Sequence, residues 1–147
     1  MIKKITIRDM GLSDVEMVLT HGSKEPTFRN LSGNEIFWDR DVLENWVKSQ
    51  GDIAIVAEYD KELAGFLLAT YSPTNYKGTF ENSYVLPNYR RLSIATEMYQ
   101  ELERRMRKRG ARLLCGFPEI ANTPSLRMLD KFEFTKGQLC YWMIKFL

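Results

Sequence analysis

The 147-residue sequence predicts a mixed α/β fold, an α+β arrangement built on one mixed sheet. The second half alternates β-prone runs with helical patterns, and a helix that crosses between the runs near Thr79 and Ala111 requires a parallel pair of strands there. The first half contains two β-rich runs joined by a polar turn, which adds antiparallel neighbours. We expect one domain over residues 1–147, a common size for a single core.

The first half begins with a strand and continues with two helices. Isoleucines alternate with polar residues in KITIRDM, which is typical of a strand with one buried face. Ser13 and Glu16 stand at the spacing of a capping box and predict the start of a helix. Asp39 is a candidate N-cap for a second helix in DRDVLENWVKSQG. Residues 23–38 between these helices carry proline, glycine and polar residues, and we expect an irregular loop there.

Three further strands are predicted in the middle of the chain. The run DIAIVAEYDKELAGFLLATY has the pattern of a hairpin with its turn at residues 60–62. Gly65 inside the second arm indicates a bulge or a close backbone approach. The next strand covers roughly residues 79–86, because Pro87 has no N–H for a sheet ladder.

The last third predicts a long helix, a strand, a helix and a final strand. From Ile94 to Met106 apolar residues recur every four positions, and Gly110 follows as a helix stop. ARLLCGF is typical of a short buried strand, and NTPSLRMLDKF of a helix capped by Thr123. The β-prone run LCYWMIKFL predicts a last strand. We therefore expect roughly six or seven strands and about four helices.

Composition argues against several classes of protein. Lys and Arg total 21 against 19 Asp and Glu, and a net charge of +2 gives no case for general nucleic-acid binding. The basic run at residues 104–112 is a local exception. Pairs at i,i+4 spacing, Glu101 with Arg105 and Glu103 with Arg107, favour a solvated helix face with salt bridges, while a role in binding adenosine phosphates stays open.

Targeting and cysteine patterns indicate an ordinary cytoplasmic protein. No apolar run approaches the roughly 20 residues of a membrane span, and the N-terminus lacks the apolar stretch of a signal peptide. We therefore expect a cytoplasmic location and no membrane association. Cys115 and Cys140 are far apart and lack zinc-ligand spacing, so we expect free, partly buried thiols and no metal site.

The stretch YVLPNYRRLSIAT, residues 84–96, joins a strand to the long helix. The first N–H groups of that helix, its dipole, Arg90 and Arg91 together suit a phosphate or pyrophosphate. The alternative is that the two arginines are solvated loop residues and that Ser93 is an ordinary N-cap.

On these residues the chain resembles the GCN5-related N-acetyltransferase (GNAT) superfamily, a fold that transfers an acyl group from acyl-CoA to an amine. The superfamily's cofactor motif has Arg or Gln, two variable residues, Gly, one variable residue, then Gly or Ala. It is matched here by Arg90, Arg91, Leu92, Ser93, Ile94 and Ala95. NTPSLRMLDKFEF resembles the second motif through Asn122, Ser125, Lys131 and Phe134. The resemblance covers nearly the whole chain.

The resemblance implies acetyl-CoA as the cofactor. Its pyrophosphate would lie against the backbone N–H groups of residues 91–96, and its pantetheine arm would pair with Tyr84 and Val85 in a slot opened by a bulge. Asn122 would hydrogen-bond the same arm. The cofactor-binding residues predicted in this way are Tyr84, Val85, Arg90, Arg91, Leu92, Ser93, Ile94, Ala95, Thr96, Asn122 and Ser125.

Three positions depart from the superfamily pattern. Ser93 stands where Gly is usual, so its side chain either crowds the pyrophosphate or donates a further hydrogen bond to it; we favour the second. Leu129 stands where many members have a tyrosine that protonates the leaving thiolate. Glu133 replaces the usual Gly before Phe134. The usual general acid is therefore missing from its place.

Acyl transfer needs a neutral amine, and a carboxylate can remove its proton. Glu81 is the candidate base, at a position similar to a glutamate base in diamine acetyltransferases; the alternative is a surface or salt-bridged glutamate. Tyr84 and Tyr141 are either substitute acids or packing residues. His21 is the sole histidine, so no Ser-His-Asp arrangement is expected, and we interpret it as a helix-end residue.

Three hypotheses follow from the sequence. The first is an acetyl-CoA-dependent N-acetyltransferase acting on a primary amine of a small molecule or peptide, the second a CoA-binding sensor without catalysis, and the third a nucleic-acid-binding protein using residues 104–112. A homodimer is compatible with each. Acidic residues in or beside the long first-half loop would suit a cationic acceptor or are simply solvated: Glu25, Glu35, Asp39 and Asp41.

Overall fold

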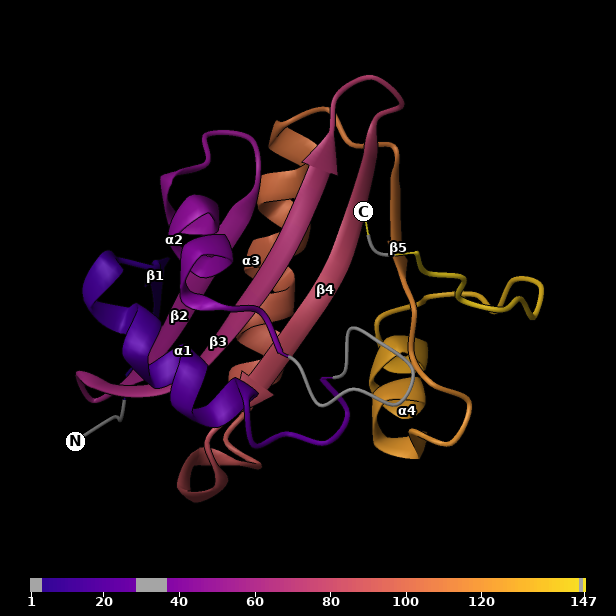
Figure 1. Ribbon diagram of the computed structural model, residues 1–147. Helices are drawn as coiled ribbons and strands as arrows, with labels where there is room; N and C mark the ends of the chain where they lie inside the picture. The colour runs from indigo at the N-terminus through magenta and orange to yellow at the C-terminus, as the bar shows by residue number, and fades with distance from the viewer. Residues whose placement is uncertain (1–3, 29–36, 146) are drawn as a thin grey trace.

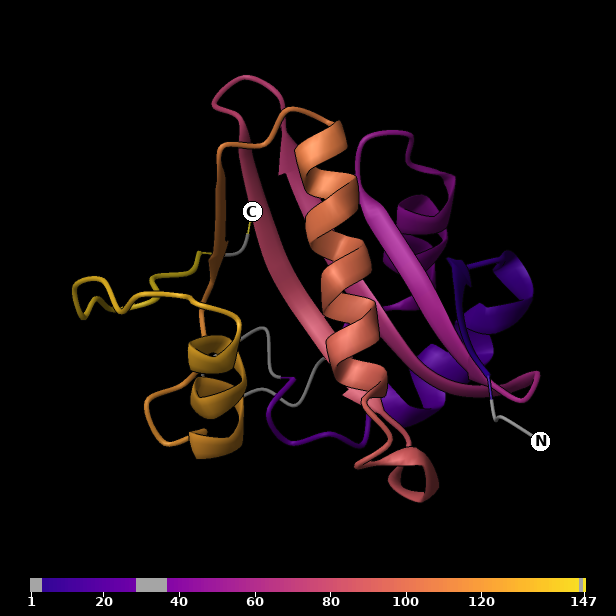
Figure 2. The same cartoon turned by 180° about the vertical axis from the view of Figure 1, so that it is seen from behind.

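The computed structural model describes residues 4–28, 37–145 and 147. Its centre is a five-stranded sheet in the order β1-β2-β3-β4-β5. Neighbouring strands are antiparallel except β4 and β5, which are parallel. α3 crosses one face of the sheet, and α1 and α2 cover the other (Figures 1 and 2). The elements are β1 (Ile5–Asp9), α1 (Val15–Gly22), α2 (Arg40–Lys48), β2 (Ile53–Tyr59), β3 (Glu62–Ser72), β4 (Lys77–Val85), α3 (Ile94–Lys108), β5 (Leu113–Gly116) and α4 (Thr123–Lys131), with short 3-10 turns at Leu12–Asp14 and Pro87–Tyr89.

The predicted mixed α/β fold is confirmed, but the predicted strand count is too high for the described residues. The β-prone run after residue 138 forms no strand over residues 139–145. Tyr141 is 92% exposed and Trp142 68% exposed, and the chain runs outward after α4 before its last described residues return toward β5 (Figure 1). Strand propensity reflects pairing and packing with neighbouring strands, and among the described residues this run joins no ladder, although the Trp142 ring lies 5.5 Å from that of Phe117, just after β5.

The beginning of α1 differs from the prediction. Asp14, not the pair Ser13 and Glu16, organises this turn: its carboxylate accepts a hydrogen bond from the Gly11 backbone N–H at 2.8 Å. The Arg8 guanidinium donates to the same carboxylate at 2.7 and 3.1 Å. Asp14 is only 4% exposed, so this ion pair neutralises a buried charge.

Side-chain caps define two other helix starts. The Asp39 carboxylate accepts from the Val42 N–H at 3.0 Å, which confirms the predicted cap of α2. In α4 the Asn122 side chain accepts from the Ser125 N–H at 3.2 Å. Asn122 is therefore the N-cap, and the predicted Thr123 is the first helical residue.

The central hairpin has the predicted turn and close approach. Asp60 and Lys61 adopt φ of 51° and 74°, the left-handed conformation that a two-residue hairpin turn needs. A Cβ at Gly65 would lie 2.6 Å from the Tyr84 carbonyl oxygen. Glycine at this position therefore lets β3 and the end of β4 lie in close contact.

Two apolar layers enclose the sheet. The layer beneath α3 contains Ile55, Leu67, Met98 and Leu102, all fully buried. The layer beneath α1 and α2 contains residues from both helices and from the central strands: Met10, Val15, Val18, Phe37, Leu43, Trp46, Val56, Phe66 and Leu68. Because both faces are covered, the functional groups described below lie at the end of the sheet where β4 and β5 separate.

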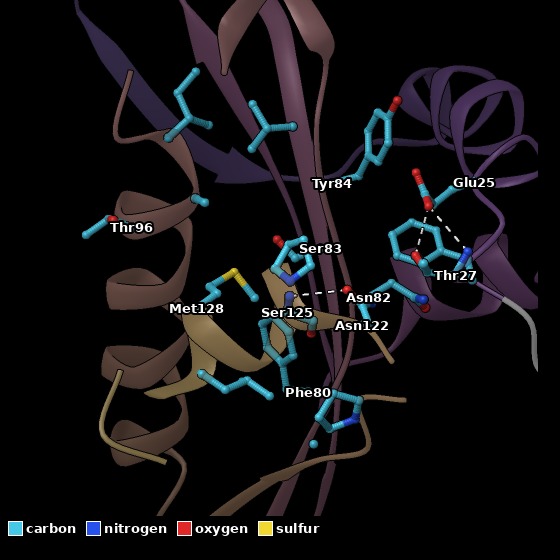
Figure 3. Close-up of a pocket in the computed structure, with 18 of the residues that line it drawn as sticks. Glu25, Thr27, Phe80, Asn82, Ser83, Tyr84, Thr96, Asn122, Ser125 and Met128 are labelled. Atoms are coloured by element: carbon cyan, nitrogen blue, oxygen red, sulfur yellow. Dashed lines mark hydrogen bonds between the residues drawn. The ribbon is translucent and has the colours of Figure 1, made fainter. Parts of the chain in front are cut away.

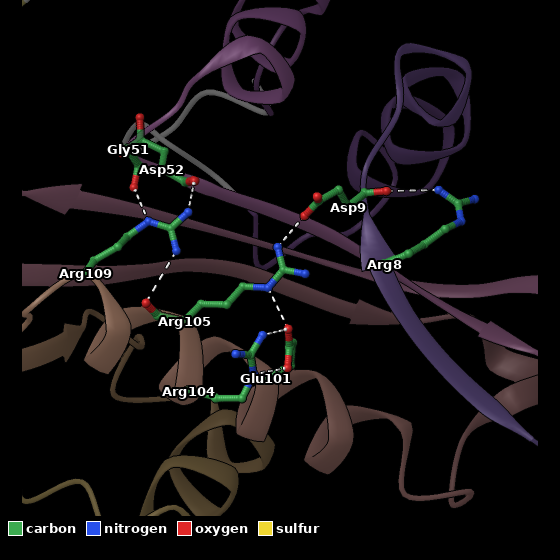
Figure 4. A network of polar contacts seen from close by, with 8 residues as sticks. All are labelled: Arg8, Asp9, Gly51, Asp52, Glu101, Arg104, Arg105 and Arg109. Carbon is green, nitrogen blue, oxygen red and sulfur yellow. Dashed lines mark hydrogen bonds and ion pairs between the residues drawn. The ribbon is translucent and has the colours of Figure 1, made fainter.

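Arginines fix the C-terminal half of α3 against the sheet (Figure 4). Arg105 pairs with Glu101 at 2.7 Å and also with Asp9 of β1. Arg109 donates to the carbonyl oxygens of Gly51 at 2.8 Å and Asp52 at 3.4 Å, just before β2. These contacts set the direction of α3, and with it the position of its N-terminus.

The predicted salt bridges on the basic run are confirmed. Arg105 pairs with Glu101, and Arg107 pairs with Glu103 at 2.6 Å. Arg104 also pairs with Glu101, at 2.7 Å. Three arginines of the run are thus engaged with carboxylates of the same helix.

Candidate active site

A cleft of about 800 Å³ opens where β4 and β5 part. The parallel ladder begins with Lys77 opposite Leu113 and ends with Phe80 opposite Gly116. β5 ends there, whereas β4 continues to Val85, so among the described residues that side of β4 has no strand partner beyond Phe80. α4 and the start of α3 form the other walls (Figure 3). Backbone hydrogen-bonding groups of β4 are consequently available to an extended ligand arm.

The N-terminus of α3 lies at one end of this cleft. Ser93 is its N-cap and adopts φ 64°, in the left-handed region, without a side-chain capping bond. Arg91 adopts φ 63°. The N–H groups of residues 94–96 have no acceptor within the helix because they belong to its first turn. With the helix dipole, these donors favour an anion.

Cationic side chains reinforce that end. The Arg90 Nε donates to the Val85 carbonyl oxygen at 3.1 Å, and the Arg90 guanidinium lies 5.6 Å from the centre of the Tyr84 ring. Lys131 of α4 donates to the Thr96 hydroxyl of α3 at 3.1 Å. Arg91 is exposed at the cleft. The cleft end at α3 therefore carries positive charge from both of its walls.

α4 supplies a polar cap and an apolar residue. Asn122 and Ser125 line the cleft, although the Asn122 oxygen is already engaged as the helix cap. Leu129 also lines the cleft and is 7% exposed, so no hydroxyl group stands at that point of α4. Glu133 has φ 65°, which accounts for a preference for glycine at such a position.

A β-bulge sets the orientation of Glu81. Leu68 of β3 pairs with Asn82, whereas the next residue, Ala69, pairs with Phe80, so Glu81 is the extra residue of β4. Its carboxylate accepts a hydrogen bond from the Thr70 hydroxyl at 3.2 Å. The Glu81 side chain thus leaves β4 at the point where the cleft begins.

The environment of Glu81 changes its acidity. Partial burial raises the pKa of the Glu81 carboxyl above its ordinary value, and the negative charge of Asp52 raises it further, while the Thr70 hydrogen bond opposes both. A carboxylate with a raised pKa holds a proton more strongly, and is therefore a better base near neutral pH.

Aromatic rings and an amide line the side of the cleft that faces α1. The Tyr84 ring stacks on Phe66 at 5.8 Å and on His21 of α1 at 5.7 Å. The indole N–H of Trp38 donates to the Asn82 side-chain oxygen at 2.7 Å. Glu25, which follows α1, lies at the rim near Tyr84 (Figure 3).

The structure brings most of the predicted site residues together. All the predicted cofactor-binding residues line the cleft except Leu92, which is 37% exposed outside it. Their roles stay predictions. Tyr141 is 92% exposed and is neither a packing residue nor part of the cleft lining. Tyr84 is a packing residue that also reaches the cleft, and His21 lies in the last turn of α1 as predicted.

The predicted acidic acceptor residues do not all lie at the cleft. Glu25 lines it, Asp39 caps α2, and Asp41 is exposed on α2 away from the lining residues. Glu35 lies outside the described residues. Sequence reasoning missed Asn82 and Glu119; a polar residue inside an otherwise β-prone run was the only signal for Asn82.

Within the described residues, other kinds of site lack support. No group of three or more His, Cys, Asp or Glu side chains could hold a metal ion there. Cys115 is half-buried and Cys140 exposed, both free thiols, so the expected partial burial holds for Cys115 only. In the same part of the chain, no helix combines the length and apolar character needed to cross a bilayer.

The chain belongs to the acetyltransferase (GNAT) family, whose sequence model matches residues 21–134. Comparison with curated proteins finds no match. Many solved structures share the fold.

Three of these structures illustrate the similarity. A transcriptional regulator from Bacillus halodurans C-125 is 18% identical with a TM-score of 0.79, covering 97% of this chain and 100% of its own. The aminoglycoside 6'-N-acetyltransferase AAC(6')-Ih from Acinetobacter baumannii is 17% identical with a TM-score of 0.75, covering 98% and 99%. AAC(6')-Iy, in complex with a bisubstrate analog of CoA and acetylneamine, is 16% identical with a TM-score of 0.75, covering 98% and 99%. At these identities the similarity establishes the fold alone.

Proposed function

We propose that the protein is an acetyl-CoA-dependent N-acetyltransferase that acts on a primary amine of a small molecule or peptide. The observation that carries this proposal is the cleft beyond Phe80, which joins an anion-binding helix start to a half-buried carboxylate. Family membership supports the reaction class. The CoA-bound form of AAC(6')-Iy supports the type of cofactor.

The residues present fit CoA in two ways. Its phosphates would be held by the N–H groups of residues 94–96 together with Arg91 and Lys131, because this end of the cleft gathers donors and positive charge. Its pantetheine arm would be held by the backbone of β4 from Glu81 to Val85, which no strand of the described residues covers on that side. When bound, acetyl-CoA supplies a thioester carbonyl that a neutral amine can attack.

Glu81 would remove the proton of the incoming ammonium group. One proton of the ammonium group would pass to the Glu81 carboxylate. As the N–C bond forms and the C–S bond breaks, the second proton lost by the nitrogen would pass to the departing sulfur, or to water where the sulfur leaves as thiolate. A thiol with a pKa near 8 to 9, the range of a cysteine thiol, leaves without a dedicated acid. This accounts for an active site in which Leu129 replaces a hydroxyl-bearing residue.

The acceptor would be cationic before it reacts. Glu81, Glu25 and Glu119 also line the cleft, and Glu25 lies on the opposite side of β4 from Thr96 of α3 (Figure 3), so negative charge lies away from the phosphate end. An ammonium group is therefore attracted to the end where its proton is removed.

A second candidate function is a CoA-binding sensor without catalysis, which the buried Leu129 favours. Both candidates require CoA binding. Isothermal titration and thermal melting with acetyl-CoA test that requirement, and no heat and no melting shift at millimolar concentration would remove both. Thiol release during incubation with acetyl-CoA and a panel of primary amines distinguishes the enzyme from the sensor. A homodimer and a cytoplasmic location stay predictions.

A further inference from the structure

The bulge in β4 gives two consecutive side chains the same face of the sheet. In a regular strand, neighbouring side chains point to opposite faces. Here Glu81 bonds to Thr70, and Asn82 bonds to Trp38, which packs in the layer beneath α1 and α2. Thr70 points to that same layer, because its neighbour Ala69 packs beneath α3. A carboxylate and an amide therefore lie side by side at the cleft.

The orientation of the Asn82 amide is fixed by its partner. The Trp38 indole N–H can only donate, so the Asn82 atom 2.7 Å away is the oxygen, and the amide nitrogen points elsewhere. Asn82 is 7% exposed. Within the described residues, the Asn82 amide nitrogen has no hydrogen-bond partner. In the same part of the chain, every fully buried side-chain nitrogen or oxygen atom has a partner. The nitrogen is therefore not fully buried, and because Asn82 lines the cleft we infer that this nitrogen faces the cleft.

An N–H₂ group that faces a ligand cleft from a largely buried side chain selects for an oxygen atom. It can donate two hydrogen bonds and accept none, so it gives nothing to an ammonium group. If an apolar ligand group covers it, the donor loses its water without replacement, which costs free energy. The neighbouring Glu81 carboxylate has the opposite preference and suits the ammonium group itself.

We propose, resting on the acetyltransferase function above, that Asn82 is a specificity-determining residue that donates a hydrogen bond to the acceptor. Its partner is a hydroxyl or carbonyl oxygen close to the reacting amine. Adjacent residues are separated by about 3.8 Å at their Cα atoms, so an oxygen within about three bonds of the amine nitrogen fits both side chains. The acceptor class is therefore amino alcohols or α-amino carbonyl compounds.

The position of Asn82 supports an acceptor contact more than a cofactor contact. The phosphate end of the cleft lies at α3, whereas Asn82 leaves β4 on the face covered by α1 and α2. Figure 3 shows Asn82 on the side of β4 toward Glu25 and Thr27, and Thr96 and Met128 on the other side. The acceptor approaches through the side that carries Glu25.

The test uses pairs of amines that differ in the oxygen. 2-Aminoethanol is compared with propylamine for a hydroxyl oxygen, and glycinamide with isobutylamine for a carbonyl oxygen. For each pair the ratio of kcat/KM with oxygen to kcat/KM without it is measured in the parent and in Asn82→Leu. Comparing the two ratios cancels the intrinsic difference in amine pKa between the members of a pair.

We expect the ratio to fall by about 10-fold to 100-fold in Asn82→Leu for at least one pair, and that pair identifies the oxygen type. Trp38→Phe is the matched control, because it removes the partner of the Asn82 oxygen and leaves both amide N–H groups. The ratio of the two kcat/KM values in Trp38→Phe should therefore be closer to that of the parent than the ratio in Asn82→Leu is. If Asn82→Leu fails to fold because the indole N–H is unpaired, Asn82→Leu combined with Trp38→Phe provides the same measurement.

The outcomes separate this inference from the proposed function. Acetyl transfer with equal ratios in parent and variant would overturn the role of Asn82 and leave the enzyme intact. No transfer to any of the four amines, with acetyl-CoA still raising the melting temperature, would overturn the acceptor class. No transfer and no melting shift would overturn the acetyltransferase function itself.

Discussion

Replacing Glu81 by glutamine tests whether its carboxylate removes the amine proton. Glutamine keeps the size of the side chain and its ability to accept a hydrogen bond from Thr70, but it cannot take a proton. General base catalysis typically contributes 10² to 10⁴ in rate, so we expect turnover at neutral pH to fall by about 100-fold or more. Because Glu81 lies away from the α3 end of the cleft, affinity for acetyl-CoA should change little.

The pH dependence makes the same test sharper. Burial raises the pKa of Glu81 above its ordinary 4.5, so kcat/KM of the parent should fall on the acid side as this carboxylate gains its proton. The Gln variant should lack that ionisation. At high pH the acceptor amine deprotonates in solution, and the rates of parent and variant should converge. Rates measured over about pH 6 to 10 cover the relevant amine pKa values.

Two neighbouring substitutions should move this ionisation in opposite directions. Thr70→Val removes the hydrogen bond that lowers the Glu81 pKa, so the acid limb should shift to higher pH. Asp52→Asn removes a negative charge that raises the pKa, so the limb should shift to lower pH. Parallel pH profiles for the parent and Glu81→Gln would exclude Glu81 as the base. A shift of the acid limb in the same direction in Thr70→Val and Asp52→Asn would exclude it as well.

A stability measurement tests the raised pKa of Glu81 independently of catalysis. The folded pKa of Glu81 is higher than the unfolded pKa, so the folded state binds more protons between those two values. Stability of the parent should therefore decrease as pH rises from about 4.5 through the folded pKa. Glu81→Gln removes that decrease. In chemical denaturation, the free energy of unfolding should therefore fall less between pH 5 and pH 8 in the variant than in the parent.

Three further predictions concern the fold and the cofactor. Arg8→Met leaves the Asp14 carboxylate with the Gly11 N–H but without its cation, and because the Arg8 side chain is 38% exposed we expect a loss of about 2 kcal/mol in urea denaturation. Because this arginine lowers the Asp14 pKa, the parent's stability should also fall as pH drops below about 3.8. Ser93→Gly should keep acetyl-CoA affinity and stability within about 1 kcal/mol, whereas Ser93→Tyr should abolish binding; equal titration curves for the tyrosine variant would move the cofactor elsewhere. Acetyl-CoA at a hundred times its Kd should stabilise the parent by about 2.7 kcal/mol, and an unchanged melting temperature would contradict the site.

Sequence predicted the elements whose signals are local. The periodicity of α3, the turn at Asp60 and the Asp39 cap each depend on residues within a few positions, and each was found where expected. Competition between nearby polar residues misled the prediction at α1 and α4. Asp14 rather than Ser13 organises the start of α1, because only the Asp14 carboxylate also accepts a hydrogen bond from Arg8 of the preceding strand. A rule based on residue spacing cannot predict that contact.

Long-range pairing explains the remaining differences. The last β-prone run satisfies every local rule for a strand, but a strand forms only by pairing, and residues 139–145 pair with no described strand. The site shows the same limit. Asn82 was missed because its proposed role depends on Trp38, 44 positions earlier in the chain, and on a bulge that changes the face on which it lies.

The bulge at Glu81 connects the fold to the proposed chemistry. One extra residue in β4 brings Glu81 and Asn82 to the same face, and it occurs where the ladder to β5 ends, immediately after Phe80. A regular strand would turn one of the two side chains toward the layer beneath α3, where an unpaired charge or amide is costly. The same irregularity thus begins the edge of β4 that no described strand covers, and it places the proposed base Glu81 beside the Asn82 amide. A substitution that restored regular pairing there should therefore impair acetyl transfer even with both side chains retained.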